Sequence, residues 1–212
     1  MTSLTVFFQP PLERRFEFNE APRDLQLSYS MILDTVFVKA YSPQPSDHDD
    51  FDRNWKQWFS GDPRKGGFGV KIEVAVSVSN HPRLLWFNVA PAGMQDARIA
   101  ELPGGLFSRL LQGEMVLTDS ETTYQGSSRC HAPPHRRMLK FVPQFDKAEL
   151  TIQRGAERCN KWIRDWEILN GADGIFRCSP RSALFWPHIT CAISVICKLI
   201  AIDQDLTNGI FY

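Results

Sequence analysis

The amino-acid sequence predicts an α/β fold, a mixed β-sheet flanked by helices, and three stretches carry that prediction. Residues 70–78 alternate apolar and other side chains with a period of two, which is typical of a β-strand. Residues 115–119 form a short apolar run that ends in Asp119 and indicate a buried strand. Residues 144–169 carry an apolar stripe at helical spacing, which predicts a long amphipathic helix.

The chain has 212 residues, enough for one large domain. Residues 1–29 contain a pair of prolines and a charged run and are expected to form an irregular or helical lead-in, followed by a domain over 30–205. The expected elements are, in order, a strand at 31–41, a hairpin at 70–89, a helix at 96–112 interrupted at 103–105, a strand at 115–119, and helices at 144–169 and 180–203.

Composition leaves nucleic-acid binding open, because the 24 basic and 24 acidic residues balance and a basic surface requires local clustering. The five cysteines include no CxxC pair, and reduced thiols in an intracellular compartment are the simplest interpretation. The N-terminus lacks the features of a secretory signal. The most apolar segment, 183–202, contains Pro187, His188 and Lys198, so a buried helix is favoured over a membrane span and no membrane partner is expected.

Three acids stand at positions where a site is expected. Asp34 lies inside the 31–41 strand, where Asp is depleted, and Asp119 ends the 115–119 strand at the rim of the sheet. Glu157 lies on the 144–169 helix in a charged stripe with Lys161 and Arg164. By spacing alone, Glu157 is more readily explained as an ion-pair partner of Lys161 one helical turn away.

Five blocks in order resemble the DDE endonuclease family of Harbinger-type transposases. Asp34-Thr35 after apolar residues resembles its first acid block, and 60–71 is similar to its glycine- and lysine-rich turn and second strand. The blocks 91–99, 116–126 and 154–169, which include Asp119 and Glu157, resemble its three later motifs. The resemblance covers about residues 30–200.

The resemblance implies a ribonuclease H-like sheet flanked by helices and a metal-dependent DNA endonuclease located in the nucleus. Asp34 would bridge two Mg²⁺ or Mn²⁺ ions, with Asp119 and Glu157 holding one ion each. The family's N-terminal helix-turn-helix region is not seen, so a separate DNA-binding protein is an expected partner. The expected DNA-binding residues are Arg129, Arg136, Arg137, Lys161 and Arg164.

Other functions stay open at this point. A non-catalytic relic of a transposase, acting as a binding module for DNA or protein, is the main alternative, and a metal-dependent phosphatase using the same acids is a third. Cys130, His131 and His135 suggest zinc only weakly, because no fourth ligand follows at a familiar spacing, and a solvated loop is favoured. Asp96 is expected to be a helix N-cap.

Overall fold

The computed structural model describes residues 12, 15–16, 30–40, 58–61, 67–78, 83–118, 127–131, 160–161, 163, 169, 186–187, 189–191 and 193. Its strands are β1 (Met31–Lys39), β2 (Phe59–Ser60), β3 (Gly67–Ser77), β4 (Leu84–Pro91), β5 (Val116–Thr118) and β6 (Cys130–His131). Its helices with defined bounds are α2 (Asp96–Glu101) and the 3₁₀ helix η5 (Leu106–Arg109).

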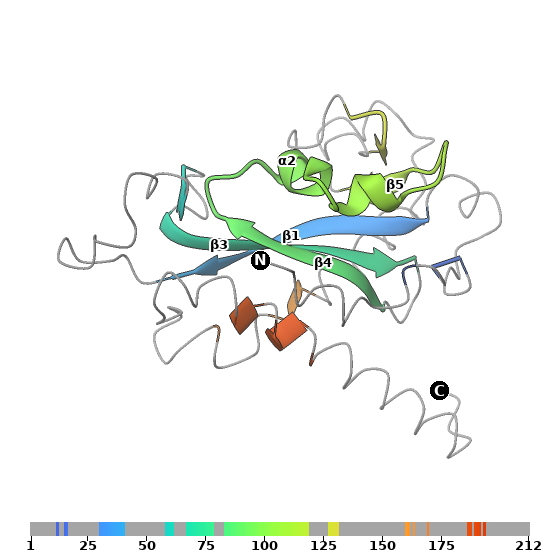
Figure 1. Cartoon of the computed structure of the whole chain (residues 1–212). Coiled ribbons are helices and arrows are strands. Elements are labelled where there is room, and N and C mark those ends of the chain that lie inside the picture. Colours follow the sequence, from blue (N-terminus) through green and yellow to red (C-terminus); the bar gives the residue numbers. More distant parts are fainter. Residues whose placement is uncertain are drawn as a thin grey trace, which may run out of the picture.

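The strands form one sheet in the order β2-β3-β1-β5-β6, and β4 also pairs with β3. The β1–β3 and β3–β4 pairs are antiparallel, whereas β5 runs parallel to β1 and β6 runs parallel to β5. The long strands β1, β3 and β4 cross the middle of the molecule (Figure 1). Every further element is therefore arranged around β3 and β1, which lie inside the sheet.

The central position of β3 follows from its sequence. Its valine and isoleucine side chains at even positions are completely buried on one face of the sheet, and successive side chains point to opposite faces. β-Branched side chains suit this environment because they pack well on a pleated surface. The same alternation continues in β1, where Ile32 and Val36 share this first face.

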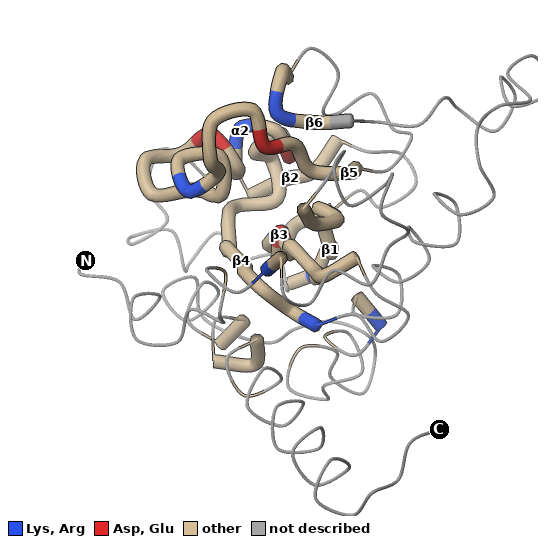
Figure 2. Tube along the Cα trace, turned by 90° about the vertical axis from the view of Figure 1, so that its right-hand side faces the viewer, with Lys and Arg blue, Asp and Glu red and all other residues tan. Residues whose placement is uncertain are grey.

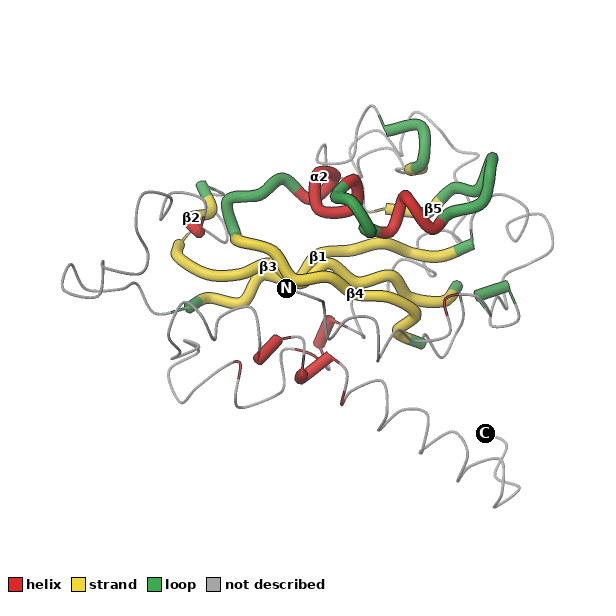
Figure 3. Tube along the Cα trace, viewed as in Figure 1, coloured by secondary structure: helices red, strands yellow, loops and turns green. Residues whose placement is uncertain are grey.

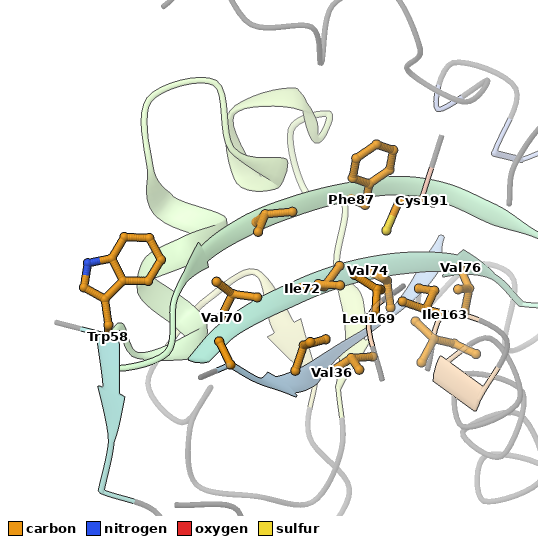
Figure 4. Packing of buried hydrophobic residues seen from close by; sticks show 14 of the residues in the cluster. Val36, Trp58, Val70, Ile72, Val74, Val76, Phe87, Ile163, Leu169 and Cys191 are labelled. Carbon is orange, nitrogen blue, oxygen red and sulfur yellow. The ribbon is translucent and has the colours of Figure 1, made fainter. Parts of the chain in front are cut away.

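The first face carries the larger core cluster. Figure 4 shows side chains of β1 and β3 packed near Ile163, Leu169 and Cys191, which come from the second half of the chain. All three of these covering residues are at most 1% exposed. Helical residues far along the sequence thus close one face of the sheet.

The second face is covered by α2 and η5, which lie on the opposite side of the sheet from the helical residues of the second half of the chain (Figure 3). Trp86 of β4 packs there with Ala100 and Leu106, and all three are at most 2% exposed. The ammonium group of Lys71 donates to Asp96 Oδ1 at 2.7 Å and to the Met94 carbonyl oxygen at 2.9 Å. These bonds link β3 to the first turn of α2.

The predicted ribonuclease H-like α/β class, a mixed sheet flanked by helices, is wrong. The described part of the chain is rich in strand, its sheet is curled into half of a barrel, and its two helices with defined bounds are short. Strand twist and the register irregularity between Ala75 and Val76 of β3 provide a physical reason for the curl, because a bulge bends and twists its strand.

The region after the hairpin shows why long helices do not form there. The antiparallel β3–β4 hairpin itself confirms the prediction for 70–89. The predicted interruption of the 96–112 helix at 103–105 is confirmed, because α2 and η5 are separated by a segment that contains Pro103 and Gly104, the latter at φ 77°. The predicted N-cap at Asp96 is wrong, since Gln95 is the cap and Asp96 is the first helical residue.

The two late helices predicted at 144–169 and 180–203 fall largely outside the described residues. Their described members, among them Ile163 and Cys191, are helical, and both of these side chains are buried. Within the described ranges, no helix combines the length and the apolar character needed to cross a membrane.

We expect Gly69→Ala to destabilise the protein. A Cβ atom at Gly69 would lie 2.3 Å from the Val38 carbonyl oxygen and 3.0 Å from the Phe37 ring, so β1 and β3 would have to separate locally. Overpacking of this kind costs about 1–3 kcal/mol, which lowers the melting temperature of a chain of this size by roughly 2–12 °C.

The matched control is Gly61→Ala, where a Cβ atom would meet nothing within 4 Å. Thermal unfolding followed by circular dichroism measures both variants. Equal melting temperatures for the two variants would contradict the close approach of β1 to β3.

Candidate metal centre

Asp34 is a carboxylate in the middle of a central strand. It lies in β1 opposite Val74 of β3, and strand alternation places it on the same face as Ile32 and Val36. Its neighbours on that face are buried and apolar, whereas Asp34 itself is half-buried. Aspartate is depleted in strands, so its presence here calls for a specific role.

The Asp34 carboxylate accepts hydrogen bonds from described residues at both of its oxygens. Oδ1 accepts a hydrogen bond from the Thr35 backbone N–H at 2.7 Å, and Oδ2 accepts a short one from the side-chain amide of Asn160. Asn160 is helical and only 6% exposed. A residue 126 positions further along the chain is therefore brought against Asp34.

Sequence analysis missed Asn160. The signal is a polar amide beside Cys159 and Ile163, within the apolar stripe of the predicted 144–169 helix. A polar group at such a position requires a partner when the stripe is buried. The partner itself, Asp34, is visible only in the folded chain.

Asn160 also provides a test of whether a cation fits here. Its Oδ1 atom is buried and has no hydrogen-bond partner among the described residues. Carboxylate and amide carbonyl oxygens are the ligands that hard divalent cations prefer. The donor set at Asp34 and Asn160 thus fits Mg²⁺ or Mn²⁺.

The other two predicted acids, Asp119 and Glu157, lie outside the described residues. Among the residues described, no group of three or more His, Cys, Asp or Glu side chains is placed to hold a metal. The β1–β5 pairing sets Leu33 beside Thr118, the residue before Asp119 in the sequence. The complete three-acid site stays a prediction.

The second face of the sheet holds a buried carboxylate that the sequence pattern did not indicate. Glu73 of β3 is 0% exposed and lies opposite Thr35 of β1 and Asn88 of β4. Its place in an alternating strand suggests a solvent-facing side chain. Burial follows instead from α2 and η5, which cover this face.

Glu73 also affects Cys130, one of the weak zinc candidates. Cys130 lies in β6 and not in a solvated loop. Burial, with smaller contributions from the charges of Glu73 and Glu101, raises the pKa of its thiol to about 11. At neutral pH this thiol is therefore protonated when no metal is bound. The His131 side chain and His135 lie outside the described residues.

The predicted DNA-binding residues are only partly described. Figure 2 shows in blue a basic segment of the described chain next to β6. Arg129, which directly precedes β6 in the sequence, donates from Nη1 to the Leu111 carbonyl oxygen at 2.7 Å and makes a longer contact of 3.4 Å to the Glu114 carbonyl oxygen. These contacts hold the 111–114 turn. Lys161 is exposed next to Asn160. Arg136, Arg137 and Arg164 lie outside the described residues.

The 111–114 turn also binds the lead-in segment, through a contact of Glu114 with Arg15. The Arg15 guanidinium makes two parallel bonds to the Glu114 carboxylate, at 2.5 Å from Nε and 2.6 Å from Nη2. Both side chains are about 5–6% exposed, and such forked pairs are the strong ones. Nearby Leu12 packs in the core of the second face.

No protein-family model, curated protein or solved structure matches this chain. The assignment of a function therefore depends on the residues and their geometry.

We expect the Arg15–Glu114 pair to stabilise the fold in a pH-dependent manner. Burial alone would raise the pKa of Glu114, but hydrogen bonds, the strongest from Arg15, hold it below its usual value. A carboxyl group whose pKa is lower in the folded state stabilises the fold at pH values above its unfolded pKa of about 4.3. This stabilisation is lost as the pH falls through the folded-state pKa. Glu114→Gln should therefore lower the free energy of unfolding by about 1.5–3 kcal/mol at neutral pH, and by progressively less below about pH 4.

Thermal unfolding between about pH 7 and about pH 3 measures this difference. Glu101→Gln is the control, because Glu101 is exposed and its ion pair with Arg98 contributes little at any pH. A gap between parent and Glu114→Gln that stays constant down to the lowest pH would contradict the assignment.

Proposed function

We propose that this chain is a divalent-metal-dependent nuclease that hydrolyses phosphodiester bonds in DNA, as the resemblance of its sequence motifs to the DDE endonucleases of Harbinger-type transposases implies. The observation that carries the proposal is the half-buried Asp34 carboxylate on an apolar sheet face, in contact with the buried amide of Asn160. A carboxylate beside an unsatisfied carbonyl oxygen is suited to a hard cation.

The sequence positions of the other two acids, Asp119 and Glu157, support the same proposal. Thr118, which pairs with the residue before Asp34, is followed directly by Asp119. Asn160, which contacts Asp34, follows Glu157 by three positions. Asp119 and Glu157 lie 85 and 123 positions after Asp34 in the sequence. Each of them is nevertheless within three positions of a described residue that contacts Asp34 or pairs with its neighbour Leu33.

The proposed roles follow from the chemistry of each group. Asp34, Asp119 and Glu157 would supply the anionic oxygens that hold Mg²⁺ or Mn²⁺. When bound, two such ions supply an activated water and neutralise the leaving oxygen. Lys161, exposed beside Asn160 in the sequence, would contact DNA phosphates, as would the other basic residues predicted above. A separate DNA-binding protein and a nuclear location belong to the same proposal.

A non-catalytic binding module is the second candidate, and one observation favours it. Both oxygens of Asp34 already accept hydrogen bonds from protein donors, so its carboxylate is stabilised without a cation. A carboxylate kept only for structure would look similar. Activity measurements on variants of the acids separate the two candidates.

We expect the parent to nick supercoiled plasmid DNA in the presence of Mn²⁺, and Asp34→Asn to lose this activity. The substitution keeps the shape of the side chain but removes an anionic metal ligand. The expected loss is on the order of a thousandfold or more, and Asp34→Asn/Asp119→Asn should be little worse, since residues that act as one unit are not additive.

The control for loss of charge is Glu101→Gln on α2, which lies over the other face of the sheet and should cut like the parent. Hydrolysis of a phosphate monoester is measured in parallel, and activity on it alone would indicate a phosphatase. If Asp34→Asn cleaves the plasmid at the parent rate, the nuclease proposal is wrong. It is also wrong if the folded parent does not cleave the plasmid.

A further inference from the structure

We propose that Asn160 is itself a ligand of the divalent cation held by Asp34, through its carbonyl oxygen Oδ1. The inference rests on the proposed function, because it requires a cation at Asp34. It adds a neutral oxygen from a helical residue to the three acids that the resemblance implies. Sequence analysis assigned no role to this residue.

The first step concerns the unsatisfied atom. Asn160 is 6% exposed, and within the described part of the chain its Oδ1 atom is buried with no hydrogen-bond partner. Buried polar side-chain atoms in native proteins nearly always have a partner, so an orphan requires a specific explanation. An ordered water or a bound cation can satisfy a buried carbonyl oxygen, and the Asp34 carboxylate beside it favours a cation.

The second step concerns position. The Nδ2 atom of the same planar amide donates to Asp34 Oδ2, so Oδ1 lies within a few ångströms of the carboxylate. A cation between the carboxylate and the carbonyl oxygen would contact both. A 180° rotation of the side-chain amide on ion binding would exchange Nδ2 for Oδ1 next to Asp34. The ion would then neutralise the carboxylate, in place of the hydrogen bond that Nδ2 donates to it.

The third step concerns charge. Carboxylates that share one site repel one another, so each further acid placed beside Asp34 would add to that repulsion. An amide oxygen adds coordination without adding negative charge. Asn is a common ligand of hard cations for this reason, together with carboxylates and water.

The experiment measures Mn²⁺ binding to the full chain by isothermal titration calorimetry, so its readout does not depend on cleavage. Asn160→Leu keeps the approximate volume of the side chain but removes the oxygen. It should raise the dissociation constant for Mn²⁺ about 10- to 100-fold. Asn160→Asp restores an oxygen and should bind at least as tightly as the parent. Asn88→Leu is the matched control, because Asn88 lies on the opposite face and its Oδ1 accepts from the Val89 N–H.

The outcomes separate this inference from the proposed function. If Asp34→Asn loses Mn²⁺ while Asn160→Leu binds like the parent, Asn160 only donates a hydrogen bond and the inference fails, whereas the proposed function stands. If the folded parent binds no Mn²⁺, both fail. If Asn160→Leu does not fold, Asn160→Asp decides, and weaker binding than the parent overturns the inference.

Discussion

The antiparallel pairing of β1 with β3 is the interaction on which the other described features depend. It runs without interruption from Met31 opposite Ser77 to Lys39 opposite Gly69. Because both strands carry buried side chains on both faces, this one ladder organises two cores, one closed by late helical residues and the other by α2 and η5. The β4 and β5 strands extend the ladder on either side, so the ladder also fixes where each of their residues lies.

The candidate site is a local exception to this apolar design. On the first face, Asp34 lies between Ile32 and Val36, and both of these neighbours have apolar side chains. A carboxylate there loses hydration, and hydrogen bonds such as those from Thr35 and Asn160 offset that cost. Positions that oppose the rules of packing in this way are typical of functional sites.

On the second face, buried and half-buried charges connect separate parts of the chain. Lys71 and Asp96 join β3 to α2, and the Arg15–Glu114 pair joins the lead-in segment to the turn before β5. Arg129 reinforces that turn through backbone carbonyl oxygens. Since a buried charge is stable only when it is paired, these contacts define which segments must lie together. Arg129 therefore has a structural role whether or not it also meets DNA.

The sequence by itself determined β1, the β3–β4 hairpin, β5 and the unusual character of Asp34. Strict alternation predicted β3 and its hairpin, and the depletion of aspartate in strands singled out Asp34, because both signals depend on neighbouring residues only. Only the tertiary structure decided the curled sheet, the burial of Glu73 and the contact of Asn160 with Asp34. Those features arise from twist summed along paired strands and from contacts between segments that are distant in the sequence, 126 positions apart for Asn160 and Asp34, which no local pattern encodes.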